Sequence, residues 1–477
     1  MKYETVLGLE VHVELATKSK IFCSCTTEFG GEPNTHCCPI CTGMPGVLPV
    51  LNKKVVEYAV AVGLATKCDI TPHGKFDRKN YFYPDLPKAY QVSQLYFPIC
   101  RNGSLEIQVG DEKKNIGIHE IHMEEDAGKL IHDPIFDATL ADYNRCGVPL
   151  IEIVSEPDFR SSAEVIAYLE SLKAILQYLG VSDCKMQEGS LRADINLSVR
   201  PQGQEELGTR TEMKNMNSFR AIARAIEAER QRQIEVLEDG GKVIQQTRRW
   251  DDNKGSSYSM RSKEDAQDYR YFPEPDLSPV VISEEWKEEI RKSLPMLPGE
   301  RKEKYIEKYG LSEYDAAIIV GIKALADYFE DVNNIVKDPK EVANWLLGEV
   351  MRLAKEGEED CFNLTLSGEN LAAIIMMIKN NVINRNTAKK VFSAVWNENL
   401  DPKAYVAEHN LAMEGDDDLI LEIVLKVLAN NPKTVEEFKS GKEKVVGFLV
   451  GQCMKELKGK ADPGTINQLL KTELQKS

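Results

Sequence analysis

Five cysteines close to the N-terminus have the spacing of a metal site. Residues 19–46 contain five of the eleven cysteines of the chain, and four of them form two short pairs separated by twelve residues. Such pairs are typical of tetrahedral zinc sites built from thiolates, and a site with four protein ligands is structural. We therefore expect a structural Zn²⁺ ion on Cys23, Cys25, Cys38 and Cys41.

Two neighbouring residues and two other kinds of cysteine chemistry remain alternatives. His36 and Cys37 lie inside the loop and are further candidate zinc ligands. A disulfide is disfavoured if the chain is cytoplasmic, since thiols there stay reduced. A redox Cys-x-x-Cys pair is expected at the start of a helix. The segment "CTGMPG" that begins at Cys41 breaks any helix, and this favours the metal site.

Polar residues also recur at every second position of several predicted strands. In "LGLEVHVEL" (7–15), Glu10, His12 and Glu14 share one face, and apolar residues occupy the other. Segments 190–199 and 208–219 alternate in the same way, with Arg192, Asp194 and Asn196 in the first and Arg210, Glu212 and Lys214 in the second. Each strand alone could simply expose a solvated face. Together they suggest one polar face shared by several strands.

Further acidic residues fit the same surface. "GIHEIHMEEDAGK" brings His122, Glu124, Glu125 and Asp126, and Glu152 lies within an otherwise apolar strand. Several carboxylates around one concavity repel one another unless cations lie between them. Oxygen ligands with few nitrogens suit Mg²⁺ or Mn²⁺. Enzymes that transfer a phosphoryl group from a nucleotide use Mg²⁺ bound by carboxylates, with lysine and arginine residues nearby.

A basic and aromatic segment could hold that nucleotide. "KFDRKNYFYPDLPKAYQVSQ" (75–94) mixes Arg78, Lys79 and Lys88 with Tyr81 and other aromatic residues. Such interleaving can bind phosphates and stack on a base, although a plain basic loop has the same composition. The chain contains neither G-x-x-x-x-G-K-[ST] nor G-x-G-x-x-G, so a glycine-rich phosphate loop is not expected.

Length and composition place these residues in an ordinary globular protein. The chain has 477 residues, 42% hydrophobic and 29% charged, with a net charge of −16. This charge argues against coating nucleic acid through bulk electrostatics. It leaves room for local recognition of a structured RNA by the lysine-rich last 46 residues. No apolar run is long enough to span a membrane, and the first residues do not resemble a signal peptide. We therefore expect a cytoplasmic protein that does not bind a membrane.

The hydrophobic period changes along the chain. Up to about residue 280 the period is near two, and beyond a proline-rich stretch it becomes about 3.6. The predicted fold is therefore α+β: a large, mainly antiparallel sheet domain (1–294) followed by two small all-helical domains (295–404 and 405–477). Ser367 is the predicted N-cap of one helix.

Long motifs throughout the chain resemble one family, the B subunits of aspartyl/glutamyl-tRNA(Asn/Gln) amidotransferase. The motifs, in chain order, are "GLEVHVEL", "KFDRKNYFYPDLPKAYQVSQ", "HMEEDAGK", "PLIEIVSEPD", "EGSLRADINLSVR", "DYRYFPEPDL", "NWLLGEV", "TAKKVF" and "GFLVGQCMKELKGKADPGTINQLL". The resemblance implies a cradle domain related to glutamine synthetase and guanido kinases, followed by helical domains that touch tRNA. It also implies a heterotrimer whose other members are an amidase (glutaminase) and a small wrapping protein.

The same resemblance implies a reaction. ATP would phosphorylate the side-chain carboxylate of Glu or Asp misacylated on tRNA(Gln) or tRNA(Asn), and ammonia from the amidase would displace the phosphate. Residues matching the metal-binding positions are Glu10, His12, Glu125, Glu152 and Asp194. We expect Glu124, Glu212, Lys79 and Lys214 to contact nucleotide or substrate. The further candidates for cofactor binding are Arg78, Tyr81, Arg192 and Arg210.

Two other functions are compatible with part of these features. The first is a zinc-containing RNA-binding scaffold without catalysis. The second is a free-standing ligase, similar to glutamine synthetase, that acts on a small molecule. The sequence does not decide between Asp-tRNA(Asn) and Glu-tRNA(Gln) as substrates.

Overall fold

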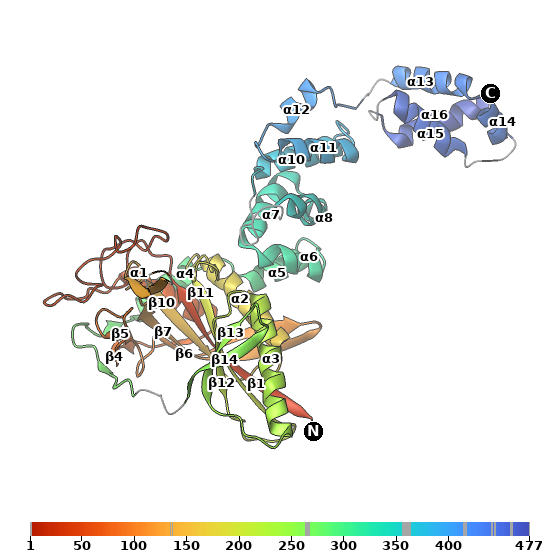
Figure 1. Ribbon diagram of the computed structural model, residues 1–477. Coiled ribbons are helices and arrows are strands. Elements are labelled where there is room, and N and C mark those ends of the chain that lie inside the picture. The colour runs from red at the N-terminus through yellow and green to blue at the C-terminus, as the bar shows by residue number, and fades with distance from the viewer. Residues whose placement is uncertain are drawn as a thin grey trace. The chain divides into compact units, whose positions relative to one another are not determined.

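The chain folds into two compact units, Met1–Arg301 and Lys302–Ser477, in the computed structural model (Figure 1). The structure describes residues 2–133, 135, 137–262, 268–354, 364–413, 417–439, 442, 445–457 and 461–476. The first unit combines a large sheet with helices, and the second is helical in its described residues. This agrees with the predicted sheet domain followed by a helical region.

A nine-stranded sheet is the framework of the first unit. Its order is β14-β13-β12-β11-β1-β10-β7-β6-β2. All neighbours are antiparallel except β12 and β13, which are parallel. The bounds of its strands are β1 Tyr3–Glu14, β2 Asp69–Ile70, β6 Cys100–Val109, β7 Glu112–Glu125, β10 Pro149–Ser155, β11 Leu191–Pro201, β12 Thr211–Lys214, β13 Gln246–Asp251 and β14 Ser256–Ser262.

Short strands form three smaller sheets in this unit. One has the order β15-β4-β5, and the others are the pairs β16-β3 and β8-β9. Their bounds are β3 His73–Gly74, β4 Asp77–Asn80, β5 Tyr90–Ser93, β8 Lys129–Asp133, β9 Ala138–Asp142, β15 Phe272–Pro273 and β16 Val280–Val281.

The alternation read in β1 and β11 divides the large sheet into an apolar and a polar face. Leu9, Val11 and Val13 of β1 are buried in the core together with residues of equivalent parity in β7, β10 and β11. Helices α1 and α2 pack on β6, and α3 packs on β11 and β14. These helices are α1 Lys53–Ala65, α2 Ser162–Leu179 and α3 Phe219–Glu238, and α4 Glu284–Ser293 follows them.

Side-chain caps define where most of these helices begin. Asn52, Ser161, Ser218 and Ser283 each accept a hydrogen bond from a backbone N–H of the first helical turn. Such caps satisfy donors that have no partner within the helix. The three helices on the large sheet therefore have fixed starting points, and the polar face on the other side is left for chemistry.

The second unit consists of helices joined by short connections. Their bounds are α5 Pro298–Glu307, which begins in the first unit, α6 Glu313–Gly321, α7 Lys323–Val336, α8 Pro339–Trp345, the π-helical turn η2 Leu346–Val350, α9 Met351–Ala354, α10 Gly368–Lys379, α11 Arg385–Val395, α12 Pro402–Glu408, α13 Asp417–Asn430, α14 Pro432–Lys439, α15 Val446–Glu456 and α16 Pro463–Lys476. Ser367 accepts a hydrogen bond from Asn370 N and is the N-cap of α10, as predicted.

The last helices have a hydrophobic core of their own. Residues from Ile420 to Leu474 on α13, α15 and α16 form one buried cluster. The boundary between the two units lies between Arg301 and Lys302, and a separate domain from residue 405 onward stays a prediction. None of the described helices is both long and apolar enough to cross a membrane.

Candidate functional site

The register of three central strands brings acidic and imidazole side chains into line. Glu152 of β10 lies opposite His12 of β1 on one side and opposite His122 of β7 on the other. Glu124, two residues beyond His122, shares its face because side chains alternate along a strand. The polar face predicted from single strands is therefore continuous across β7, β10 and β1.

The first candidate metal cluster consists of His12, Glu124 and Glu152. Each offers a ligand atom, and these atoms lie within 4.8 Å of one another. His12 Nε2 lies 3.4 Å from Glu152 Oε2 and 3.6 Å from Glu124 Oε1. Burial alone would lower the pKa of His12, but contact with Glu152 and the charges of Glu124 and Asp194 raise it. The carboxylates thus favour a positive charge at this point.

The second candidate metal cluster lies on the neighbouring strands. It consists of Glu10 of β1, Asp194 of β11 and Glu212 of β12, whose ligand atoms also lie within 4.8 Å of one another. Glu10 and Asp194 are paired across the two strands. Burial and the nearby charge of Glu152 raise the pKa of Glu10. A cation between these carboxylates would relieve that repulsion.

Lys214 supplies one positive charge to the second cluster. Its Nζ lies 2.6 Å from Asp194 Oδ2 and 2.8 Å from Glu212 Oε1. Burial would lower the pKa of Lys214, but these two carboxylates raise it. Asn196 donates a hydrogen bond of 2.9 Å to Glu10 Oε1, and Thr247 donates one of 2.7 Å to Glu212 Oε2. The cluster is therefore held by direct partners in β11 and β13.

Residues of both clusters line one pocket with a volume of about 490 Å³: His12, Glu124 and Glu152 of the first cluster and Asp194 of the second. The pocket has an acidic floor and a wall of basic and aromatic side chains. The lining residues are His12, Lys79, Tyr81, Asp85, Gln91, Glu124, Asp126, Ala127, Arg145, Leu150, Glu152, Arg192, Asp194, Lys214, Asn215, Arg249 and Met260. Carboxylates beside lysine and arginine residues can hold a divalent cation and phosphate groups together.

Two of the basic residues pair with one carboxylate, Asp126. Arg192 Nη2 lies 2.8 Å from Asp126 Oδ2, and Arg145 Nε lies 3.4 Å from the same oxygen. Arg145 also donates to the carbonyl oxygens of Ala127 and Gly128. These contacts fix both guanidinium groups at the pocket wall, where planar charge suits an anion such as phosphate or carboxylate.

Lys79 and Tyr81 reach the pocket from the basic and aromatic segment. Lys79 Nζ lies 4.9 Å from the ring centre of Tyr269 and 5.8 Å from that of Tyr81. Tyr81 and Tyr269 meet edge to face with ring centres 5.7 Å apart. The segment therefore gives the pocket one ammonium group set among aromatic rings.

Three expected site residues belong neither to the pocket lining nor to a candidate metal cluster. Glu125 makes a short ion pair with Lys88 and accepts a hydrogen bond of 2.9 Å from Val92 N, so Glu124 joins His12 and Glu152 in its place. Arg78 makes a bidentate pair with Glu274, each bond 2.7 Å long. Arg210 is exposed just before β12. None of the three is part of either candidate metal cluster among the described residues.

Sequence reasoning missed several residues that line the pocket. Arg249 is carried by β13, and the parallel pairing of β13 with β12 brings it beside Lys214. Arg145 follows the β8-β9 hairpin. The segment "QQTRRWDD" did contain a signal for Arg249. Thr247 and Arg249 are two residues apart, so on a strand their side chains lie on the same face. No local pattern indicated Arg145.

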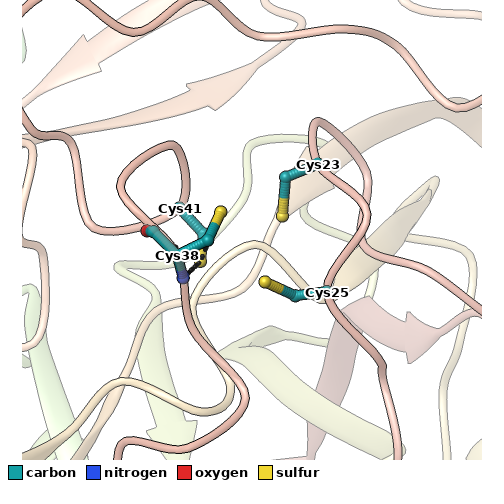
Figure 2. Close-up of side chains that lie close together, drawn as sticks. All are labelled: Cys23, Cys25, Cys38 and Cys41. Carbon is teal, nitrogen blue, oxygen red and sulfur yellow. Dashed lines mark hydrogen bonds between the residues drawn. The ribbon is translucent and has the colours of Figure 1, made fainter.

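The four cysteines come together as their spacing predicts. Figure 2 shows Cys23 and Cys25 on one loop facing Cys38 and Cys41 on another, and their sulfur atoms lie within 4.8 Å of one another. Cys38 N donates to Cys41 Sγ at 3.1 Å. Four sulfur ligands in such a group suit zinc.

The charge environment of the cysteines supports a thiolate site. Lys20 is fully buried, and its Nζ lies 3.7 Å from Cys41 Sγ. A hydrogen bond from the Cys23 thiol outweighs burial and, with Cys38 N–H and Lys20, lowers the pKa of Cys41 to about 5.

The two alternative zinc ligands, His36 and Cys37, contact other groups. Cys37 Sγ donates to Asn34 O, and His36 Nδ1 lies 3.1 Å from Glu28 O.

The cysteine loop is joined to the wall of the pocket by side-chain amides. Asn34 Nδ2 donates to Ala141 O, and Asn144 Nδ2 donates to Glu32 O at 2.7 Å. The residue that follows Asn144 is Arg145, which lines the pocket. Order in the cysteine loop therefore supports the position of Arg145.

Comparison with known proteins gives matches along the whole chain. A family described as "GatB/GatE catalytic domain" matches residues 5–288, and one described as "GatB domain" matches residues 327–474. Three similar proteins are each named as the B subunit of aspartyl/glutamyl-tRNA(Asn/Gln) amidotransferase. The relative from Lachnoclostridium phytofermentans is 66% identical and is aligned over 100% of this chain and 99% of its own. Those from Caldicellulosiruptor bescii and Thermoanaerobacter pseudethanolicus are 60% and 57% identical, with 100% of both chains covered.

Proposed function

Since the chain belongs to the family of aspartyl/glutamyl-tRNA(Asn/Gln) amidotransferase B subunits, we propose that it carries the kinase and amidation site of that enzyme. The substrates would be ATP, ammonia, and Glu-tRNA(Gln) or Asp-tRNA(Asn). The products would be Gln-tRNA(Gln) or Asn-tRNA(Asn). The observation that carries this proposal is the pair of oxygen-rich clusters on one sheet face, beside basic residues in a single pocket.

The proposed reaction consists of two displacement steps at the same side-chain carboxylate. A carboxylate is a poor electrophile, so its oxygen first attacks the γ-phosphorus of ATP, and ADP leaves. The nitrogen of ammonia then attacks the acyl carbon of the acyl phosphate, phosphate leaves, and one proton is lost. Both steps move charge onto phosphate oxygens. Positioning and electrostatic stabilisation therefore dominate catalysis of this kind.

The donor set of the two clusters fits Mg²⁺, with Mn²⁺ as a substitute. Carboxylate oxygens outnumber imidazole nitrogens, as these cations prefer. His12, Glu124 and Glu152 would hold one ion, and Glu10, Asp194 and Glu212 a second. Bound Mg²⁺ would neutralise phosphate charge during the transfer.

The pocket wall would bind and orient the substrates. Lys79, Lys214 and Arg249 offer positive charge to the phosphates, and Tyr81 offers a ring for stacking. Arg145 and Arg192, held by Asp126, can orient a carboxylate or phosphate group. Arg78 and Glu125 are not assigned to this site, because they pair with Glu274 and Lys88. Arg210 is not assigned to it, because it is exposed and is not part of the pocket lining.

We further propose the assembly that the family name implies. The partners would be an amidase, which releases ammonia from glutamine, and a small third protein. The sheet unit would be the cradle domain related to glutamine synthetase and guanido kinases, and the helical unit would contact tRNA. Zn²⁺ on the four cysteines would be structural, because four protein ligands close the coordination sphere.

A transamidation assay tests the proposal. The complex is reconstituted with its partner proteins and supplied with ATP, Mg²⁺, glutamine and each misacylated tRNA in turn. We expect amidation with wild type and its loss in Glu10→Ala and Asp194→Ala. Unchanged turnover in both variants would contradict the kinase site and favour a scaffold role for this chain. Activity of the isolated chain on a free amino acid would instead favour a free-standing ligase.

A further inference from the structure

Strand β12 is short and carries one residue of the pocket lining, Lys214, and one residue of a candidate metal cluster, Glu212. It spans Thr211–Lys214, with three residues paired to β11 and all four paired to β13. Glu212 joins a candidate metal cluster, and Lys214 bridges Glu212 to Asp194. Because side chains alternate, Thr211 and Met213 point away from the pocket. A strand this short needs further contacts to keep a metal ligand in place.

A buried carboxylate of α3 meets β12 from behind. Glu229 is 1% exposed, and its Oε1 accepts a hydrogen bond of 2.8 Å from Thr211 Oγ1. Gln233 Nε2 donates both to Glu229 Oε1, at 3.0 Å, and to Thr211 Oγ1, at 2.9 Å. Thr211 and Gln233 are themselves fully buried. The side chain directly before Glu212 is therefore fixed by two hydrogen bonds to one helix.

The same carboxylate reaches the next two strands. Glu229 Oε2 lies 3.3 Å from Arg248 Nε of β13 and 3.5 Å from Ser257 Oγ of β14. Arg248 in turn donates to the hydroxyl and the carbonyl oxygen of Ser257. One group thus links α3 to three successive strands at the end of the sheet.

The contacts of Glu229 favour its charged form. Burial would raise its pKa, but hydrogen bonds from Arg232, Gln233 and Thr211 and the charge of Arg232 lower it. Arg232 donates twice to the carboxylate, at 2.6 and 2.9 Å. Apolar packing alone would hold α3 on the sheet without fixing its register, since the hydrophobic effect has no direction. Hydrogen bonds to a buried charge do have direction.

We propose that Thr211 and Glu229 are positioning residues, which hold Glu212 and Lys214 at the distance from Glu10 and Asp194 that a divalent cation requires. The inference rests on the proposed function, because it assumes that this cluster binds Mg²⁺ or Mn²⁺. Groups that orient metal ligands from behind commonly change metal affinity by ten- to a hundredfold when they are removed. Neither residue lines the pocket.

The test measures Mn²⁺ binding to the full chain within the reconstituted complex, by titration calorimetry without ATP or tRNA. Thr211→Val removes the hydroxyl at nearly constant volume and leaves Glu229 paired with Arg232. We expect about tenfold weaker binding at one site, with a zinc content close to wild type and an unfolding transition that stays cooperative. Thr211→Ser keeps the hydroxyl and should restore the affinity.

Ser257→Ala is the matched control. It removes another hydroxyl from the same carboxylate, but on β14, which contributes no ligand to either cluster. We expect wild-type Mn²⁺ affinity. Wild-type affinity in Thr211→Val, or equal losses in Thr211→Val and Ser257→Ala, would overturn the inference.

The variant Glu212→Gln distinguishes a failure of the positioning role from a failure of the proposed metal site. If Glu212→Gln weakens Mn²⁺ binding and Thr211→Val does not, the positioning role is wrong and the metal site stands. If Glu212→Gln leaves binding unchanged, the second metal cluster is wrong, and the inference falls with it.

Discussion

His122 Nε2 lies 2.9 Å from Glu152 Oε2, and both side chains face the pocket side of the sheet. Burial would lower the pKa of His122, yet the neighbouring carboxylates of Glu124 and Glu152 raise it to about 10. Hydrogen bonds from His12 and His122, together with their charges, hold the pKa of Glu152 well below its usual range against the effect of burial. Without a metal, these contacts favour the protonated form of His122, whose positive charge would offset the carboxylates around it.

This pair predicts a pH dependence of stability in Mg²⁺-free buffer. A histidine with a raised pKa stabilises the fold fully below its ordinary value of 6.5, and this stabilisation is lost as the pH rises through about 10. We expect the unfolding midpoint of wild type to exceed that of His122→Asn at pH 6, and the difference to shrink towards pH 10. A difference that grows with pH would contradict the ion pair.

The zinc site predicts a contrast between two cysteines. Cys41→Ser should reduce bound zinc, measured by elemental analysis, from one ion per chain to nearly none. It should also lower the unfolding midpoint, because structural zinc contributes to folding. Cys37→Ser should keep both values, since its thiol points to Asn34 O. Loss of zinc in Cys37→Ser would show that the ligand set is wrong.

Removing the charge of Lys20 should change the affinity for zinc, although no zinc ligand is altered. Four thiolates on Zn²⁺ leave an excess of negative charge, and the buried ammonium lies 3.7 Å from Cys41 Sγ. Lys20→Met keeps the length and apolar stem of the side chain and removes the charge. We expect about tenfold weaker zinc binding in competition with a chelator. Lys18→Met, at an exposed position, is the control. Equal affinity in Lys20→Met and wild type would rule out this role for Lys20.

The polar face of the sheet could largely be predicted from sequence, because alternation depends on neighbouring residues alone. Alternation predicted that Glu10 and His12 share one face of β1, and that Arg192 and Asp194 share one face of β11. The same parity argument, applied to β7, separates Glu124 from Glu125 and would have favoured Glu124 as the partner of His12. The cysteine group could be predicted for a similar reason, since two short spacings determine which sulfur atoms can meet.

Contacts between distant segments could not be predicted in this way. Arg78 was expected to bind nucleotide, but its partner Glu274 lies 196 residues away and no local pattern connects them. Arg145 enters the pocket from a loop whose position depends on the cysteine loop. The parallel pairing of β12 with β13, which brings in Arg249, depends on how α3 crosses the sheet. Such arrangements arise from tertiary packing rather than from local sequence preference.

Lys214 predicts a loss of turnover without a loss of folding. Its ammonium joins Asp194 and Glu212 and faces the pocket that would hold phosphate. Lys214→Met should lower the rate of ATP-dependent amidation by about a hundredfold, as is usual when one preorganised charge is removed from a transition state. Zinc content should not change. Lys254→Met, exposed between β13 and β14, should keep the wild-type rate. Wild-type turnover in Lys214→Met would contradict its role.

The acyl phosphate itself offers the most direct test of the central proposal. The reconstituted complex is given ATP, Mg²⁺ and Glu-tRNA(Gln) or Asp-tRNA(Asn) without glutamine or ammonia, and hydroxylamine is added to trap the activated side chain. We predict side-chain hydroxamate and ADP in equal amounts with wild type, and neither with Asp194→Asn. Equal hydroxamate formation by Asp194→Asn and wild type would show that activation takes place elsewhere.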